Sequence, residues 1–152
     1  MLSSTLLSDV AHITTPKHKV ANQLIRKDIL LSTRGTIGQT EFISASARKQ
    51  VRAMNVIVRR QSDEVTPEYL LFVLSSQSFQ IKLRKITKGV SIPFVSNRDL
   101  GNISIPIIPI SQQKKKGEAF MKLFTPYQKA LKKYDSAKED LGAAKSKLVR
   151  FR

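Results

Sequence analysis

The 152-residue sequence has no cysteine and no tryptophan, and only 11 of its residues are acidic. The absence of cysteine excludes a disulfide framework, a thiolate zinc site and a cysteine nucleophile. No run of eighteen apolar residues occurs, so no transmembrane helix is predicted. The first fifteen residues also lack the basic segment and apolar stretch of a secretory signal. These absences predict a soluble, cytoplasmic protein with no membrane partner.

The abundant residues are basic: 27 lysines and arginines give a formal net charge of +16. Hydrophobic residues make up 41% of the chain, which is enough to bury a core, and the length suits one domain or one domain with an appendage. Repulsion among the excess positive charges destabilises a compact chain unless an anionic partner neutralises them. Nucleic acid is therefore the leading partner class, and an anionic membrane surface is the second.

The composition changes near residue 111. Before it, fifteen basic and seven acidic residues accompany β-branched runs and five of the six prolines; after it, twelve basic and four acidic residues fill 41 helix-forming positions. We therefore expect an α/β (α+β) domain over residues 1–110 and a helical, coiled-coil-like arm over residues 111–152.

Secondary-structure signals in the first part are mixed. Three apolar or alternating segments predict strands: residues 28–33, 39–44 and 54–60. Thr66 and Pro67 form a typical helix start, and residues 76–86 predict a second helix ending at Gly89. Residues 103–110 (ISIPIIPI) alternate isoleucine with serine and proline, which predicts an extended edge or connector.

The arm has an apolar stripe with alternating steps of four and three residues. Its members are Phe120, Phe124, Tyr127, Leu131, Tyr134, Leu141 and Leu148. Pro126 should start a new helix or kink a continuous one, so we expect helices over residues 112–124 and 126–150. The stripe requires a cover, which could be its own globule, a second copy or another protein. A membrane is the least favoured cover.

Two turns are candidate nucleic-acid contacts. Residues 32–38 (STRGTIG) place two glycines three apart beside serine, threonine and arginine, a combination suited to close phosphate contact. A tight turn without a ligand is an equal alternative from spacing alone. The segment is no Walker loop, which ends in Gly-Lys-Ser/Thr, and the apolar run before it makes the GxxG clamp of a KH domain improbable. Residues 88–91 (KGVS) form the second turn.

Basic residues cluster in four groups, each of which could alone be a solvated face. The groups are Lys17 and Lys19; Arg48, Lys49 and Arg52; Arg59 and Arg60; and Lys82, Arg84, Lys85 and Lys88. Together they predict a positive surface.

Catalytic signals are weak. His12 and His18 are the only histidines and lack metal-ligand spacing, and no cofactor loop or nuclease carboxylate pair is present. We expect no enzyme activity, no metal site and no cofactor.

Three segments in order resemble the specificity subunits of type I restriction-modification systems. Residues 28–38 (DILLSTRGTIG) resemble their GDILLSxRGTIG segment, residues 67–74 (PEYLLFVL) resemble their PxYLxYxL helix, and residues 89–113 resemble the passage ending in IPlPPlxEQ that leads into a conserved helix. The match runs from about residue 26 to residue 113, and the tail matches in character.

The resemblance implies a target recognition domain followed by a spacer helix that docks methylase subunits, with the chemistry on the methylase and restriction subunits. Carried over to this sequence, the expected DNA-binding residues are Ser32, Thr33, Arg34, Gly35, Thr36, Lys88, Gly89 and Ser91. The expected partner-binding residues are Phe124, Tyr127, Leu131, Tyr134, Leu141 and Leu148. Gln112 and Gln113 open the arm.

Two departures from the family pattern keep alternatives open. Full specificity subunits carry two halves and usually a tryptophan-containing start, whereas this chain has one half and no tryptophan. It could be a half-length subunit acting as a homodimer or with another half, a partial product, or a remnant that binds the methylase without full DNA recognition. A helix over residues 126–150 spans about 37 Å, near the roughly 34–36 Å between half-sites one DNA turn apart.

Overall fold

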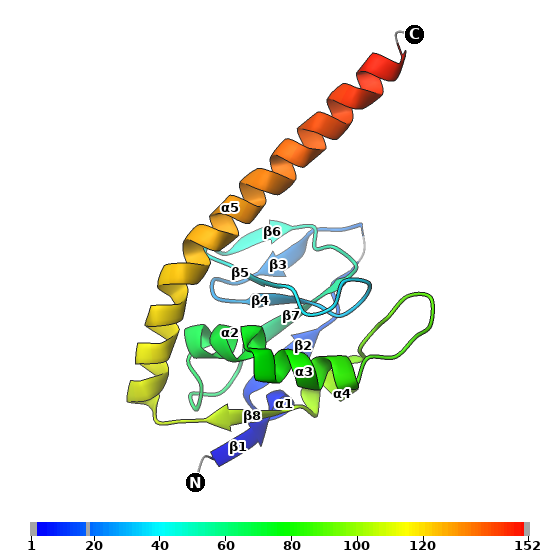
Figure 1. Ribbon diagram of the computed structural model, residues 1–152. Coiled ribbons are helices and arrows are strands. Elements are labelled where there is room, and N and C mark those ends of the chain that lie inside the picture. Colours follow the sequence, from blue (N-terminus) through cyan, green and yellow to red (C-terminus); the bar gives the residue numbers. More distant parts are fainter. Residues whose placement is uncertain (1–2, 18, 151–152) are drawn as a thin grey trace. The chain divides into compact units, whose positions relative to one another are not determined.

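A computed structural model describes residues 3–17 and 19–150, and His18 lies outside the described residues. The predicted α/β (α+β) domain followed by a helical arm is confirmed (Figure 1). The strands are β1 (Ser3–Leu6), β2 (Ala11–Thr14), β3 (Asn22–Leu24), β4 (Ile29–Ser32), β5 (Thr40–Phe42), β6 (Ala47–Lys49), β7 (Asn55–Arg60) and β8 (Ser104–Ile107). The helices are α1 (Leu7–Val10), α2 (Pro67–Ser75), α3 (Gln77–Lys85), α4 (Asn97–Gly101) and α5 (Ile110–Arg150).

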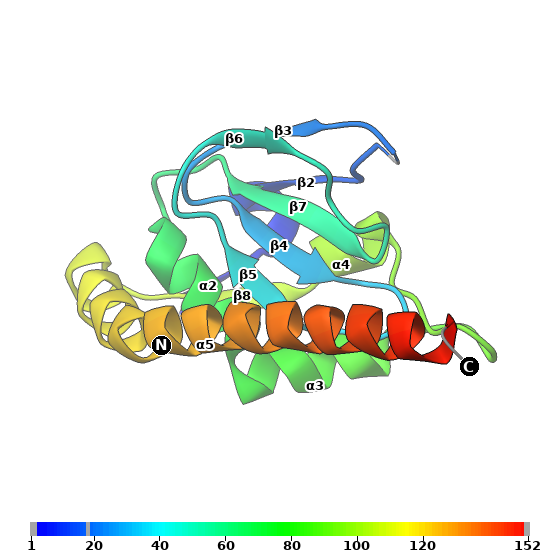
Figure 2. The same ribbon diagram turned by 90° about the horizontal axis from the view of Figure 1, so that it is seen from above.

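The core of the globule is a four-stranded antiparallel sheet in the order β2-β7-β4-β5. All of β4 is buried, as its continuous apolar run suggests, because both faces of the sheet are covered. Figure 2 shows the β3–β6 ribbon on one side of the sheet and helices α2 and α3 on the other. A small core that includes Leu24, Leu30 and Ile57 lies between the ribbon and the sheet, and Leu30 and Ile57 are register partners.

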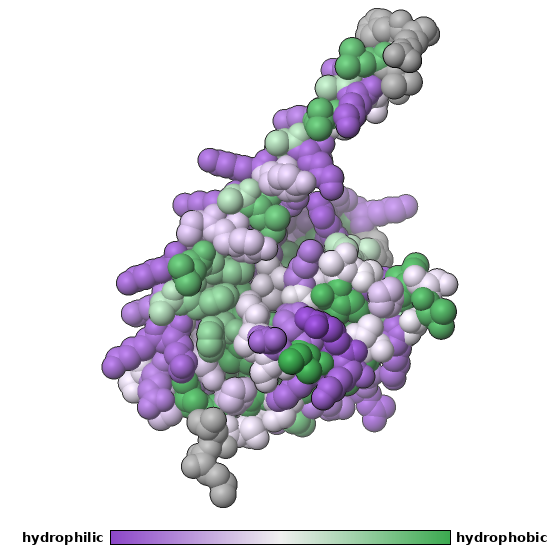
Figure 3. Space-filling view, viewed as in Figure 1, coloured by the Kyte–Doolittle hydropathy of each residue, from purple (hydrophilic) through white to green (hydrophobic). Residues whose placement is uncertain are grey.

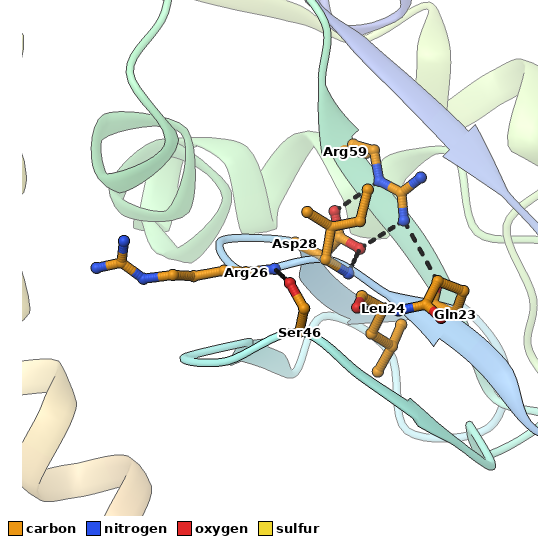
Figure 4. Close-up of polar contacts among 7 residues, drawn as sticks. Gln23, Leu24, Arg26, Asp28, Ser46 and Arg59 are labelled. Carbon is orange, nitrogen blue, oxygen red and sulfur yellow. Dashed lines mark hydrogen bonds and ion pairs between the residues drawn. The ribbon is translucent and has the colours of Figure 1, made fainter.

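A buried ion pair ties β7 to the residue that precedes β4 (Figure 4). Asp28 is 2% exposed, and its two carboxylate oxygens accept hydrogen bonds from Nε and Nη2 of Arg59, both at 2.8 Å. Asp28 also accepts a hydrogen bond from the backbone N–H of Ile25 at 2.8 Å. The hydrogen bond with Asp28 raises the pKa of the Arg59 guanidinium. Arg59 is thus a structural residue rather than a free surface cation.

Serine and threonine caps set the ends of the central helices. The predicted start of α2 is confirmed, since the hydroxyl of Thr66 accepts a hydrogen bond from the N–H of Tyr69. Ser76 ends α2 and begins α3, because its hydroxyl donates to the Val73 carbonyl and accepts from the Phe79 N–H. The expected helix end at Gly89 is wrong: α3 ends at Lys85, and Lys88 instead pairs with Phe94 in a separate hairpin.

The extended segment 103–110 contains edge strand β8, as its proline punctuation predicts. β8 pairs with β1 on one side. On its other side, side chains from the helices satisfy its carbonyls: Lys82 donates to Ser104 at 2.9 Å, and the Tyr69 hydroxyl donates to Pro106 at 2.9 Å. Desolvation by burial raises the pKa of Tyr69. The strand edge is therefore closed by two long polar side chains.

The long helix α5 corrects the expected division into helices 112–124 and 126–150. It is one helix from Ile110 to Arg150, with Pro126 inside it. An interior proline removes one backbone donor and crowds the carbonyl four residues before it. The lysine, glutamine, alanine and leucine residues on both sides are strong helix formers, which lets the helix continue. The chain divides into two compact units after Glu118, so the first turns of α5 belong to the globule.

Candidate nucleic-acid interface

The first predicted turn, residues 32–38, begins at Ser32, the last residue of β4. Gly35 and Gly38 have φ angles of 73° and 96°, a conformation that glycine adopts without strain. Ser32 closes the turn, because its hydroxyl accepts a hydrogen bond from the Gln39 N–H at 2.8 Å and its carbonyl accepts one from Gly38 at 2.8 Å. A Cβ on Gly38 would overlap the side-chain oxygen of Gln80. The glycine spacing therefore reflects a tight, packed turn.

Burial divides the predicted DNA-binding residues of this turn into two sets. Ser32 is 1% exposed and Thr33 is 6% exposed, so both serve the turn and not the surface, a correction to their expected role. Thr33 donates its N–H to the Met54 carbonyl at 2.8 Å. Arg34, Gly35 and Thr36 are exposed. The surface of the turn is therefore one guanidinium, one hydroxyl and exposed backbone.

The second predicted turn is the tip of a hairpin between α3 and α4. Reciprocal backbone hydrogen bonds join Lys88 and Phe94, at 2.9 and 2.8 Å. Gly89 has a φ of 98°, and a Cβ there would overlap the carbonyl oxygen of Ile92. The loop projects from the globule in Figure 1. Its short span and required glycine fix the backbone of the segment.

The tertiary fold brings these two turns together, although residues 40–87 separate them in the sequence. The Gly35 N–H donates to the Pro93 carbonyl at 2.9 Å, and the Val95 N–H donates to the Thr33 carbonyl at 2.8 Å. The Arg34 guanidinium lies 5.9 Å from the centroid of the Phe94 ring, within cation–π distance. We call this joined feature, residues 33–39 and 88–94, the double-turn edge.

Some basic side chains at and near the double-turn edge pair with a carboxylate of the protein, and others do not. Nζ of Lys88 lies 3.2 Å from a carboxylate oxygen of Asp99, and the Lys88 side chain is 66% exposed. Hydrogen bonds from Lys88 and then Ser96 lower the pKa of Asp99. Over the described ranges 3–17 and 19–150, no carboxylate pairs with Arg34, Arg84 or Lys85. These three cations are therefore free to meet an anion.

Several basic residues from the sequence clusters have internal partners instead. Arg59 pairs with Asp28, Arg60 pairs with Asp63 at 3.1 Å, and Lys49 lies 3.5 Å from Glu41. Lys27, which has a φ of 75°, pairs with Glu68 at 2.8 Å. Part of the predicted positive surface is thus neutralised within the fold.

The sequence analysis missed the apolar side chains of the second turn. Val90 is 105% exposed, Ile92 is 58% exposed and Phe94 is 36% exposed. The alternating run VSIPF, directly after Gly89, is the signal that could have identified an exposed hairpin.

On α5, most of the predicted partner-binding residues are exposed. The exposed fractions are 59% for Tyr127, 41% for Leu131, 63% for Tyr134, 55% for Leu141 and 71% for Leu148. Phe124 differs, since it is 7% exposed and its ring lies 5.4 Å from the ring of Phe120. Leu123 lies off the predicted stripe and is 76% exposed. The helix thus presents five large apolar side chains of the stripe to solvent.

Within residues 3–17 and 19–150, no group of three or more histidine, cysteine or acidic side chains could hold a metal ion. His12 is an exposed residue of β2. No helix in the described part of the chain is long and apolar enough to cross a membrane.

Comparisons with known proteins agree with the resemblance seen in the sequence. Residues 3–136 match a family model described as a type I restriction modification DNA specificity domain. No match is found among curated protein sequences.

Solved structures share the fold at low sequence identity. The S subunit of a type I restriction-modification system from M. genitalium has a TM-score of 0.63 and 12% identity, over 90% of this chain and 41% of that chain. The HsdS subunit from Thermoanaerobacter tengcongensis has a TM-score of 0.58 and 17% identity, over 88% of this chain and 39% of that chain. A third structure, from a study of assembly and conformational transition of the type I R-M system, has a TM-score of 0.60 and 16% identity, over 91% of this chain and 42% of that chain. The chain thus spans about two fifths of the length of these relatives.

Proposed function

Because the chain belongs to the family of type I restriction-modification DNA specificity domains, we propose that it is a sequence-specific DNA-recognition module. In this role it directs the methylase and restriction subunits of such a system to a bipartite DNA target. The chain supplies one recognition half, in keeping with the two fifths of the S subunit length that it spans. The observation that supports the proposal most directly is the double-turn edge.

The double-turn edge suits duplex DNA for a physical reason. Three glycines with positive φ, Gly35, Gly38 and Gly89, shape its backbone, and hydrogen bonds join the two turns. An ordered backbone loses less conformational entropy on binding. The guanidinium of Arg34 and the hydroxyls of Thr36 and Ser91 offer donors for phosphates. Arg84 and Lys85, exposed in the last turn of α3, extend the positive charge.

Not all the expected DNA-binding residues keep the same role in this proposal. Arg34, Thr36 and Ser91 contact DNA directly, whereas Gly35 shapes the first turn and joins it to the second through its N–H bond to the Pro93 carbonyl. Gly89 shapes the hairpin, and Lys88 shares its charge with Asp99. Ser32 and Thr33 are buried, and their hydrogen bonds hold the backbone of the first turn.

The arm has a separate partner. Tyr127, Leu131, Tyr134, Leu141 and Leu148 bind either a second S half, including a second copy of this chain, or the methylase subunit. An amphipathic helix is stabilised when its apolar face is covered, and these side chains are exposed on α5. The expected boundary at residues 110/111 lies at the start of α5, whereas the compact unit of the globule continues to Glu118. Phe124 is excluded from this surface because it is buried.

The proposed module performs no chemistry and needs no cofactor. Methyl transfer and DNA cleavage belong to the methylase and restriction subunits. We place the assembly in the cytoplasm, where its DNA substrate lies.

The test is selection of bound duplexes from a random library by the full chain together with the methylase subunit encoded beside it. A recognition module enriches one sequence, with an affinity about 10³-fold or more above that for random duplex at fixed salt. Equal binding of all duplexes, with the methylase still bound, would instead identify a remnant that binds the methylase without DNA recognition.

A further inference from the structure

The tip of the second turn, Val90, Ser91 and Ile92, is a rigid projection. Hydrogen bonds between Lys88 and Phe94 close its base, and Gly89 allows no side chain because of the Ile92 carbonyl. The base is in turn fastened to the first turn through the bond from Gly35 to Pro93. The base of the tip is therefore tied to the globule on both sides.

The tip is also apolar where solvent exposure is greatest. The Val90 side chain is 105% exposed and the Ile92 side chain is 58% exposed, whereas Val95, just beyond the hairpin, is 5% exposed. Figure 3 shows apolar side chains at the end of this projecting loop. A single exposed apolar residue is ordinary, but two on a fixed tip form a small contact surface.

Basic groups surround this apolar tip. Arg34 contacts the Phe94 ring at its base, Lys88 begins the hairpin, and Arg84 and Lys85 precede it on α3. Asp99 is the nearby carboxylate, and Lys88 pairs with it. A small apolar tip with basic residues at its base is complementary to a DNA groove. The rims of such a groove are anionic phosphates, and its floor has apolar groups.

The major groove provides such an apolar group, the C5-methyl of thymine. The groove is about 12 Å wide and admits an element as wide as a two-stranded β-ribbon. The Lys88–Phe94 loop is closed at its base by a single antiparallel β-bridge. On the premise of the proposed function, we infer that Val90 and Ile92 contact thymine methyl groups in the major groove. Arg34 contacts a phosphate on the groove's rim, which sets the depth of insertion.

The experiment compares thymine with uracil, which lacks the methyl group. The duplex enriched by the full chain with its methylase is resynthesised with deoxyuridine at each thymine in turn. The wild-type chain should lose about fourfold in affinity at one or two positions, the value of one buried methyl group. V90S and I92S should lose affinity for the thymine duplex by a similar factor and no longer distinguish uracil from thymine there.

The matched control is I81S, because Ile81 is 42% exposed on α3 and removing it makes the same chemical change elsewhere. It should keep the wild-type preference for thymine. The inference is overturned if V90S and I92S retain that preference, if the enriched duplex has no thymine, or if these variants lose the methylase and not the DNA.

The proposed recognition function and the proposed role of the tip can be disproved separately. If no duplex is enriched by the wild-type chain, the proposed recognition function itself fails, and the inference fails with it. If a duplex is enriched but its affinity does not depend on thymine methyl groups, only the role of the tip is wrong. Thermal unfolding of each variant verifies folding, which the exposed positions should leave unchanged.

Discussion

Gln113 accepts a hydrogen bond from the backbone N–H of Thr66 through its side-chain oxygen, at 2.9 Å. Its side-chain nitrogen donates to the carbonyls of Glu64 and Ile108 at 2.7 and 2.9 Å, and the residue is fully buried. One amide near the start of α5 thus satisfies three backbone groups from the loop before α2 and the end of β8. This contact anchors the first turns of the helix to the globule.

Replacing this amide should destabilise the globule. Gln113→Ala leaves three buried backbone groups unpaired, and we expect the free energy of unfolding to fall by about 2–4 kcal/mol. Urea unfolding followed by circular dichroism measures the change. Gln112→Ala is the matched control, because Gln112 is exposed on the same turn and its loss should cost less than about 0.5 kcal/mol. Equal effects of the two substitutions would show that the buried network is not stabilising.

Two glycines of α5 should respond in opposite ways to alanine. A Cβ on Gly117 would lie 2.9 Å from Cβ of Glu68 and 3.1 Å from the backbone nitrogen of Tyr69, so α2 and α5 would have to separate. We expect Gly117→Ala to destabilise the globule by about 1–3 kcal/mol despite the better helix propensity of alanine. The quantity to measure is the midpoint of thermal unfolding.

Gly142→Ala serves as the comparison. No atom lies within 4 Å of a Cβ at Gly142, and the residue is exposed. The substitution should therefore stabilise the helix by up to about 1 kcal/mol, visible as greater helicity. A stabilising Gly117→Ala substitution would contradict the close packing of α2 on α5.

The ion pair of Asp28 and Arg59 should contribute far more than the exposed pair of Arg60 and Asp63. Asp28→Ala removes a 2% exposed carboxylate and leaves the Ile25 N–H and the Arg59 guanidinium without their acceptor. We expect a loss of about 2–4 kcal/mol in the free energy of unfolding, somewhat below the cost for a fully buried pair because Arg59 is partly exposed. Asp63→Ala, at a fully exposed carboxylate, should change it by less than about 1 kcal/mol. Chemical unfolding at pH 7 compares the two variants.

Arg34 should contribute to DNA affinity through a phosphate. Arg34→Ala should weaken duplex binding at all sequences and reduce the slope of log K against log salt by about one. Fluorescence anisotropy across a salt series measures both quantities. Arg60→Ala changes the same charge at a residue already paired with Asp63, so its salt slope should stay at the wild-type value. An unchanged slope for Arg34→Ala would identify the first turn as purely structural.

The exposed stripe of α5 should be required for assembly. Leu131→Asp with Leu141→Asp places two charges on that stripe, and we expect loss of self-association or of methylase binding while the globule stays folded. Sedimentation velocity and co-purification with the methylase report these outcomes. Ala130→Asp introduces the same side chain on an exposed position beside the stripe and should leave assembly intact. Unaltered mass and partner binding in the double variant would remove the stripe from the interface.

Short-range features of the structure were predictable from sequence. Thr66 caps α2, residues 29–32 form a buried strand, and the segment with two prolines after residue 103 forms an edge strand. Each of these depends on a side chain acting within about one turn or on a local apolar pattern. The short strands β1, β2, β3 and β6 were not predicted, since they are three or four residues long and exist only because a partner strand lies beside them.

The candidate site was predictable only in part. The sequence identified both turns and their glycines, but it assigned Ser32 and Thr33 to the surface, whereas both are buried. A hydroxyl beside a glycine serves a turn or a ligand equally well, and burial decides between them. The exposure of Val90 and Ile92 depends on Lys88 pairing with Phe94, a closure that a helix pattern ending at Gly89 does not reveal.

By itself, the sequence determined the charge, the division into a mixed globule and a helical arm, and the family, because composition, periodicity and ordered motifs are properties of the chain. Only the tertiary structure decided that Arg34 meets Phe94, that Arg59 is held by Asp28, and that Gln113 is buried. The physical reason is that partners far apart in sequence are chosen by packing and hydrogen bonding in the folded state, and local propensity has no information about them.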